Sequence, residues 1–414
     1  MSSHYILIIN ALLFSGLFLF CFYRKGCGTL AKLSTLTYAV LACCAAFFAY
    51  QGAFYGYLTG LRLWPFLVYF ILAAIMLFPF IKSDKLTEKL VINNTKRANL
   101  IGDIYLICCV IQIILTGSKA ITAVVTGNYL SLYLARGEAG ANFYYNNFFE
   151  QVVVNVVNYF FIPIVLYAFY VMVHDVAYKR KKLLMVVPFL TSSLSAVASA
   201  SRTDFFYIIL VYGTIFFLYR KPMSRKFQRA IAVVGLLFVV VAMLATRAIT
   251  ASRFAYDEEG EWLSNYFGES YIIAHDTFVH TTRYSEGTYF FRDVIPFIGV
   301  KYIPTHCTID HGFGFRPMIS TRYSDFGSIG CGVYAILCML LFTYLVSKKK
   351  YSWGMFYIIL FYYKSLTLGA FYENNTAMAW IYVLIVSFIL TKFTSTKYDK
   401  NNRILSPTVS SNAS

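Results

Sequence analysis

Long apolar runs recur along the whole chain, and they constrain its fold more than any other feature. A helix needs about 17 to 25 mostly apolar residues to cross a lipid bilayer. Eleven stretches are close to this length: residues 5–23, 33–51, 64–81, 99–116, 152–173, 183–201, 204–219, 230–246, 326–346, 353–372 and 376–391. With 59% hydrophobic and only 13% charged residues among 414, the chain has more apolar surface than a water-soluble fold could bury. The sequence therefore predicts an all-α polytopic membrane protein with a single transmembrane domain, residues 1–414.

Lysine and arginine are concentrated in alternate connections between these runs. Six connections hold 24 of the 36 basic residues: 24–32, 82–97, 174–182, 220–229, 347–351 and 391–414. Cytoplasmic loops carry such an excess of basic residues, so the pattern predicts an outer N-terminus and a cytoplasmic C-terminus. It also accounts for the net charge of +17 without nucleic acid as a partner. The outer side then holds one smaller loop, residues 117–150, and one large loop, residues 247–325.

Motifs for metals and cofactors are absent from the sequence. Of nine cysteines, only Cys307 lies in the large outer loop, and no CxxC motif or His/Cys cluster with metal-ligand spacing occurs. No glycine-rich phosphate loop is present either. We therefore expect neither a metal nor a cofactor.

The large outer loop concentrates the ionisable side chains. Residues 247–325 hold ten of the 19 acidic residues, six arginines and four histidines. Between Trp262 and Ile272, apolar residues recur at helical spacing, which is typical of an amphipathic helix on the membrane or on the bundle. Loops carried by a rigid scaffold are where binding and catalysis concentrate, so we expect the chemistry here.

A turn of almost no length joins two runs at Arg202. The preceding residues 191–201 are nearly all small, which lets helices approach closely. The Arg202 guanidinium must then lie at the outer boundary, where an unpaired ion is costly. Two interpretations remain open. Arg202 binds an anionic ligand, or it is a structural residue that pairs with Asp204 or extends to the interface.

A second polar concentration, residues 316–330, leads into the ninth run. Arg316 and Arg322 carry planar guanidinium groups that suit phosphate oxygens. Asp325 could take a proton from a hydroxyl as a general base. A carboxylate at the start of a helix is also what N-terminal capping produces. Taken alone, Asp325 fits a cap better than a catalyst.

Three stretches carry a family resemblance. The first is Ser199-Ala-Ser-Arg-Thr-Asp204, in which small residues lead into Ser-Arg-Thr. The second is Gly287-Thr-Tyr-Phe-Phe-Arg-Asp-Val-Ile-Pro296 in the large outer loop, and the third is Tyr323-Ser-Asp-Phe-Gly-Ser-Ile-Gly330 at a late span. In this order and with this plan of spans, the chain resembles the bacterial O-antigen and capsular polysaccharide polymerases of the Wzy type.

The resemblance implies glycosyl transfer on the outer side of a bacterial inner or plasma membrane. The donor would be an undecaprenyl-diphosphate-linked oligosaccharide, and the acceptor a sugar hydroxyl on a second lipid-linked repeat unit. Membrane lipids, a chain-length regulator and a flippase are the further partners it implies. Expected to bind the diphosphate and glycan are Arg202, Arg322, Arg136, Arg283 and Arg292; expected in catalysis are Asp325, His311 and Arg316, with His306 as a further candidate base. Preorganised positive charge stabilises a leaving diphosphate by several kcal/mol.

Two other activities fit parts of the same sequence. The related O-antigen ligases place a histidine nine residues before the acidic residue of a similar motif, and here that position holds Arg316, which favours a polymerase. A lipid-linked oligosaccharide flippase would need charged residues in a cavity between its spans. Asp103 and Lys364 are the ionisable residues that stand out within the runs, and they could pair with each other or line a cavity.

Overall fold

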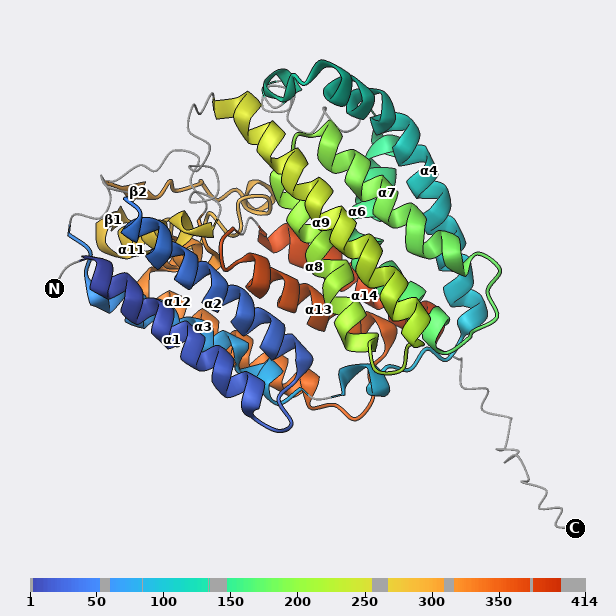
Figure 1. Ribbon diagram of the computed structural model, residues 1–414, viewed down its shortest axis with the longest axis horizontal. Helices are drawn as coiled ribbons and strands as arrows, with labels where there is room; N and C mark the ends of the chain where they lie inside the picture. The colour runs from blue at the N-terminus through green and yellow to red at the C-terminus, as the bar shows by residue number, and fades with distance from the viewer. Residues whose placement is uncertain are drawn as a thin grey trace, which may run out of the picture.

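The chain forms a bundle of long helices with a small sheet at one end (Figure 1). The computed structural model describes residues 3–52, 60–83, 85–132, 134, 147–254, 267–308, 316–372 and 375–395. Its helices are α1 (Ser3–Tyr23), α2 (Thr29–Tyr50), α3 (Leu63–Ile81), α4 (Thr95–Thr126), α6 (Phe148–Val173), α7 (Lys181–Ala198), α8 (Arg202–Tyr219), α9 (Arg225–Phe254), α11 (Glu269–His280), α12 (Met318–Val346), α13 (Trp353–Leu368) and α14 (Ala377–Thr394). Two 3-10 helices, η2 (Leu86–Lys89) and η4 (Ile295–Ile298), accompany the antiparallel strands β1 (Thr281–Arg283) and β2 (His306–Cys307).

Ten of the described helices are long and apolar enough to cross a membrane: α1, α2, α3, α4, α6, α7, α8, α9, α12 and α14. They confirm the predicted all-α polytopic membrane fold. The remaining predicted run, residues 353–372, contains only the 16-residue helix α13. α13 ends at Leu368, and the carbonyl of the next residue, Gly369, accepts a hydrogen bond from Met318 N at 2.8 Å.

Two predicted boundaries are wrong because helices continue beyond the apolar runs. α4 extends to Thr126, where Gly127 with a φ of 62° terminates it. α9 extends to Phe254, so the first residues of the predicted large loop belong to a helix. α12 begins at Met318, and the non-helical backbone of Gly327 separates its first turns from a long helical segment that matches the predicted run 326–346. Asp325 lies just before this kink, and its carboxylate accepts hydrogen bonds from residues 285–290, so the prediction that it caps a helix start is wrong.

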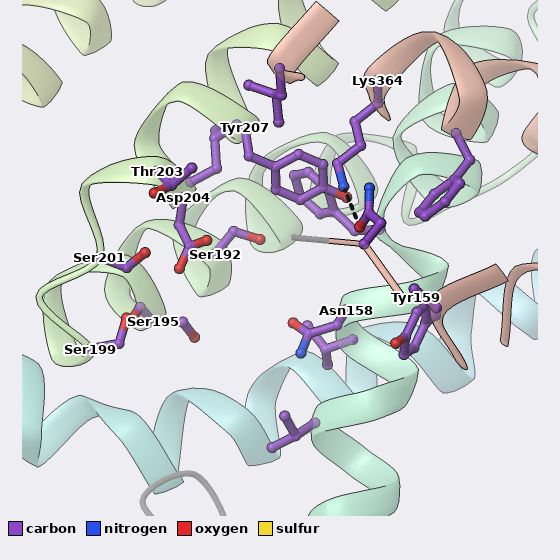
Figure 2. Close-up of a pocket in the computed structure, with 18 of the residues that line it drawn as sticks. Asn158, Tyr159, Ser192, Ser195, Ser199, Ser201, Thr203, Asp204, Tyr207 and Lys364 are labelled. Carbon is purple, nitrogen blue, oxygen red and sulfur yellow. Dashed lines mark hydrogen bonds between the residues drawn. The ribbon is translucent and has the colours of Figure 1, made fainter. Parts of the chain in front are cut away.

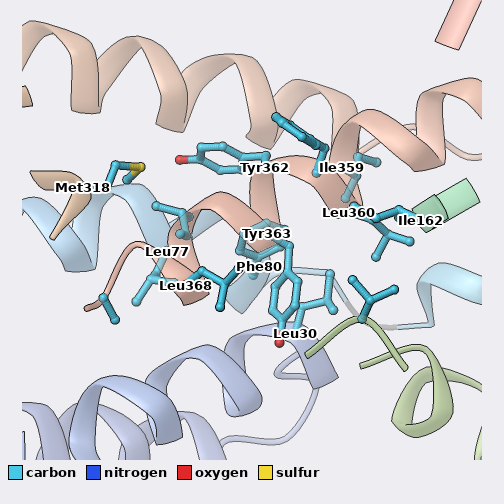
Figure 3. Close-up of a cluster of buried hydrophobic side chains, with 14 of the residues drawn as sticks. Leu30, Leu77, Phe80, Ile162, Met318, Ile359, Leu360, Tyr362, Tyr363 and Leu368 are labelled. Atoms are coloured by element: carbon cyan, nitrogen blue, oxygen red, sulfur yellow. The ribbon is translucent and has the colours of Figure 1, made fainter. Parts of the chain in front are cut away.

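α13 lies at the centre of the bundle, where it contacts α2, α6, α8, α12 and α14. Of its 16 residues, all except Met355, Ile358 and Lys364 are buried. Figure 3 shows Tyr362 and Tyr363 of α13 among the apolar side chains of neighbouring helices. Lipid tails are as apolar as these side chains, so close packing and hydrogen bonds rather than the hydrophobic effect hold such helices together.

Buried hydroxyl and indole groups supply hydrogen bonds between the helices. Tyr362 Oη donates to Met76 O on α3 at 3.0 Å. Trp353 Nε1 donates to Pro163 O on α6 at 3.0 Å. Because an unsatisfied polar group costs several kcal/mol inside a bilayer, these bonds fix which faces of α3, α6 and α13 meet.

Several of the basic connections meet at one end of the bundle. Val91 N donates to Tyr351 O at 2.9 Å, and Asn94 N donates to Thr394 O at 3.1 Å. The connection before α4, the α12–α13 connection and the end of α14 therefore touch one another. The sheet and α11 lie at the other end, beside the start of α1 (Figure 1).

Gly354 sets the separation of α13 and α14. A Cβ at this position would lie 2.0 Å from Ser387 O and 2.5 Å from Thr391 Oγ1. Gly354→Ala must push the two helices apart, which costs about 1–3 kcal/mol, so we expect a lower thermal unfolding midpoint in detergent. Gly332→Ala on α12 is the matched control, because a Cβ there meets nothing within 4 Å. Equal midpoints for the two variants would contradict this packing.

Candidate active site

Asp325 joins α12 to the segment that follows β1. Its buried carboxylate accepts hydrogen bonds from Ser285 Oγ at 2.5 Å, Tyr289 N at 3.2 Å and Phe290 N at 2.9 Å. The Asp325 carbonyl also accepts from Gly287 N at 3.2 Å. We call these four hydrogen bonds the Asp325 clasp. A general base must reach the proton that it abstracts; burial and three existing donors therefore favour a structural role for this carboxylate.

The clasp brings together two of the three stretches that carry the family resemblance, and their glycines fit the contact. Gly287 has a φ of 86°, and a Cβ there would lie 3.0 Å from the Phe326 ring. Gly327 interrupts α12 with a φ of 73°. L-residues rarely adopt these conformations, whereas glycine does so at little cost. Both glycines are therefore required by the backbone of the clasp.

The contact continues to the connection between α13 and α14. Phe290 O accepts from Ala377 N at 2.8 Å, and Arg322 Nη2 donates to Asn375 O at 2.8 Å. Arg322 is only 1% exposed, and its guanidinium lies 4.4 Å from the centroid of the Phe290 ring, within cation–π range. This arginine, predicted to bind the diphosphate, is held by a carbonyl and a ring of the protein itself.

α11 lies at the same end of the bundle and directly precedes β1 in the chain. Nine of its twelve residues are buried, so the described part of the predicted amphipathic helix is enclosed, while Trp262 lies outside the described residues. His275 Nε2 accepts from Arg62 N at 2.9 Å, and its Nδ1 lies 2.7 Å from Asp276 Oδ1. Nδ1 therefore carries the proton, and the histidine ties α11 to the start of α3.

A cavity of about 470 Å³ lies among α4, α6, α7, α8 and α13. This volume is within the range of small-molecule sites. Figure 2 shows Ser195 and Ser199 on one wall, and Asn158 and Tyr159 of α6 on the opposite wall. Serine, asparagine and tyrosine offer hydrogen-bond donors and acceptors, so the cavity is suited to a polar ligand.

The small residues before Arg202 form one wall of this cavity. Ser192, Ser195 and Ser199 line it, and their spacing of three and four residues places them on one helix face. Ala196 and Ala198 of the same stretch are buried in packing and are not among the described residues that line the cavity. Residues 191–201 therefore serve close helix packing, as predicted, and also line the cavity.

One carboxylate and one ammonium group are among the described lining residues: Asp204 on α8 and Lys364 on α13. Lys364 Nζ donates to Asn375 Oδ1 at 3.3 Å. It also lies 5.4 Å from the centroid of the Tyr207 ring and 5.0 Å from that of Phe361. The ammonium group is thus fixed at the cavity wall by an amide and two rings.

Gln112 of α4 lines the same cavity and has a buried acceptor without a partner in the described part of the chain. Its side chain is 3% exposed, and its Nε2 donates to Ser195 Oγ at 2.9 Å. Its Oε1 has no hydrogen-bond partner among the residues that the structure describes. A buried polar atom left in this way costs about 1–3 kcal/mol.

The predicted arginines do not gather in the cavity. Arg202 begins α8, and its Nη1 donates to Thr250 Oγ1 of α9 at 3.2 Å. Arg283 and Arg316 are exposed, on β1 and directly before α12, and Arg292 is partly exposed. None of these four is among the described residues that line the cavity.

Two predicted residues, Arg136 and His311, lie outside the described residues. His306 belongs to β2, and its Nδ1 lies 2.8 Å from Thr282 Oγ1 of β1. This contact joins the two strands at the end of the bundle that carries α11. Of the three predicted catalytic residues, Asp325 and Arg316 are not among the described residues that line the cavity. The third, His311, is outside the described residues.

Asp103 and Lys364 belong to different places in the bundle. Asp103 accepts hydrogen bonds from Tyr178 Oη at 2.8 Å and Arg180 Nη1 at 3.1 Å, and burial raises the pKa of Tyr178. Arg180 lies in a basic connection, whereas Lys364 faces the cavity. Of the two, only Lys364 lines this cavity.

Polar residues within the apolar runs indicated a cavity, but a hydropathy window averages over single polar residues and does not report them. Gln112, Asn158 and Lys364 are polar residues within three different apolar runs. Polar residues inside membrane helices face the bundle interior or a cavity and mark functional paths. All three line the cavity. Their polarity indicated that each faces the bundle interior, but it did not indicate that the three lie close to one another.

The clasp can be tested at Ser285, which contributes a donor without altering Asp325. Ser285→Ala leaves a buried carboxylate with one donor fewer, so we expect a loss of about 1–3 kcal/mol in unfolding free energy and a lower thermal midpoint. Ser324→Ala is the matched control, because the Ser324 hydroxyl only bonds back to Thr321 O of its own helix. If both variants unfold at the same temperature, the clasp does not stabilise this end of the bundle.

No family model, curated protein or solved structure matches the chain. The family resemblance therefore stands on the three stretches of sequence and on their positions. Two of them are bonded through the Asp325 clasp. The third, residues 199–204, contributes Ser199, Ser201, Thr203 and Asp204 to the cavity lining.

Proposed function

We propose that this chain is a membrane glycosyltransferase that polymerises lipid-diphosphate-linked oligosaccharide repeat units into a surface polysaccharide. The observation that carries the proposal is the cavity, because the stretch that resembles the central signature of the polymerases forms part of its wall. Aromatic walls with a few placed polar groups are typical of small-molecule sites. Hydroxyls, amides and tyrosine rings are the groups that a sugar needs.

The reaction joins two lipid-linked substrates. A hydroxyl of one repeat unit attacks the anomeric carbon of the other, a glycosidic C–O bond forms, and the bond from that carbon to the phosphate oxygen breaks. The lipid diphosphate leaves with the electron pair. Because negative charge accumulates on it, fixed positive groups stabilise the transition state. Lys364 in the cavity and Arg202 at the start of α8 are positive groups near such a site.

The proposal includes a topology with an outer N-terminus, a cytoplasmic C-terminus and α13 as an eleventh span. The alternation of basic connections along the sequence supports it, as do the hydrogen bonds among these connections at one end of the bundle. The cavity residues Ser199, Asp204 and Asn375 lie at turns that this topology assigns to the outer side. The enzyme would act on the outer face of a bacterial inner or plasma membrane.

Single cysteines at two exposed lysines test the topology. Lys301 lies before β2 and Lys349 lies in the α12–α13 connection, and both are exposed. A membrane-impermeant maleimide should label Lys301→Cys on intact cells and Lys349→Cys only after permeabilisation. The unsubstituted protein sets the background; its Cys27 is a poor reporter because only 6% of it is exposed. Labelling of both variants from the same side overturns the topology.

A lipid-linked oligosaccharide flippase is a second candidate. It is favoured by one observation: Asp204 and Lys364 line a cavity walled by helices that could span a membrane. Charged groups in such a cavity are also expected in a pathway for a polar headgroup. A ligase remains a third outcome of the experiment below.

Deletion of the gene separates the three activities. We expect electrophoresis of surface glycan to show a ladder that collapses to a single repeat unit, because a polymerase acts after the repeat unit has reached the outer leaflet. Complementation with the intact gene is the control and should restore the ladder. Free polymer without its lipid anchor would identify a ligase instead, and loss of all surface glycan would identify a flippase.

A further inference from the structure

We propose that Asp204 is the general base of the transfer and that Lys364 binds the diphosphate of the donor, with the acceptor sugar held in the cavity between α6 and α7. This inference rests on the proposed function. It assigns the reaction to residues that line the cavity instead of to Asp325 and the predicted arginines.

The cavity wall offers hydrogen bonds for the hydroxyls of a sugar. Gln112 lines the cavity, and its buried Oε1 lacks a partner among the described residues, so a rotation of this side chain toward the cavity would let Oε1 accept from a ligand hydroxyl. Ser192 and Ser195 lie on the adjacent wall, and Asn158 faces them from α6 (Figure 2). An acceptor sugar that bridges these walls would satisfy an atom that the protein itself leaves unsatisfied.

Asp204 is the described carboxylate that lines this cavity. It lies in the first turn of α8, and Figure 2 shows its carboxylate directed toward the serine wall near Ser192 and Ser201. Asp325, by contrast, is fully buried and accepts three hydrogen bonds from the outer segment. A base must lie within reach of the hydroxyl that it deprotonates, and Asp204 meets this condition for a sugar in the cavity.

In the proposed step, the acceptor hydroxyl gives its proton to Asp204 as its oxygen attacks the anomeric carbon of the donor. The glycosidic bond forms while the carbon–oxygen bond to the diphosphate breaks. The leaving diphosphate keeps the electron pair and its negative charge. Charge and atoms balance with the two lipid-linked substrates alone.

Lys364 is the basic group among the described lining residues. Its ammonium is held by Asn375 and lies near the rings of Tyr207 and Phe361. A compact ammonium binds phosphate as a point charge. The carboxylate and the ammonium thus suit the two ends of the transfer, where a proton is lost and where a negative charge is gained.

The test uses the purified full-length protein in detergent and the lipid-linked repeat unit extracted from cells that lack the gene. We expect Asp204→Asn to lower the polymerisation rate by about 10²-fold or more. Asp204→Glu, which keeps a carboxylate, should retain more of the rate than Asp204→Asn. Asp103→Asn is the matched control: its carboxylate contacts Tyr178 and Arg180 away from the cavity, so its rate should stay near that of the unsubstituted protein.

A binding measurement separates Lys364 from Asp204. The probe is a polyprenyl diphosphate without glycan, and binding is followed by the shift that it causes in the thermal midpoint. Lys364→Met keeps an apolar stem between the two rings but loses the charge, so we expect its affinity to fall by about tenfold or more. Asp204→Asn should bind the probe at least as tightly as the unsubstituted protein, because it lacks only a negative charge.

The outcomes distinguish the inference from the proposed function. If the unsubstituted protein polymerises and Asp204→Asn polymerises at the same rate, Asp204 is not the base and the proposed function stands. If Lys364→Met binds the probe normally, the diphosphate site lies elsewhere. If the unsubstituted protein makes no polymer, the proposed function is wrong, and binding that depends on Lys364 would still support the diphosphate site.

Discussion

The burial of the Asp325 carboxylate is the constraint on which this end of the bundle depends. A carboxylate removed from water is destabilising unless hydrogen bonds replace its hydration. Residues 285–290 must therefore lie across α12, where they supply those donors. This placement fixes the position of Phe290. The Phe290 carbonyl then accepts a hydrogen bond from Ala377 N at the start of α14. One buried carboxylate thus determines where residues 285–290 and two helices meet.

The same contacts extend to the cavity. Arg322, beside the Phe290 ring, holds the Asn375 carbonyl, and the Asn375 side chain holds Lys364. Three residues, Phe290, Arg322 and Asn375, therefore connect the buried carboxylate to the ammonium group in the cavity. Residues of this kind matter to a reaction without touching its substrates, because catalysis depends on groups held close to their working positions.

Sequence patterns predicted the class of fold because apolar length is a property of each run by itself. The ends of α4 and α9 were missed because a helix continues through polar residues that a hydropathy window excludes. The cavity was missed for a different reason. Gln112, Asp204 and Lys364 come from α4, α8 and α13, and only tertiary packing brings them together. Two of the motifs that carry the family resemblance contain the residues on both sides of the Asp325 clasp. A motif does not, however, indicate which residues its members contact.

Serine on the cavity face of α7 suits both helix packing and the binding that we propose. Ser199 Oγ donates to Ser195 O at 2.8 Å within its own helix, which satisfies the hydroxyl in an apolar environment. A hydroxyl can rotate from that carbonyl to a ligand, so it changes partners without losing a hydrogen bond. Alanine would leave the same space but offer no partner to a ligand, and leucine would extend into the cavity. Because Ala196 and Ala198 of this stretch are buried in packing, a single short stretch both closes the bundle and keeps a polar wall open inside it.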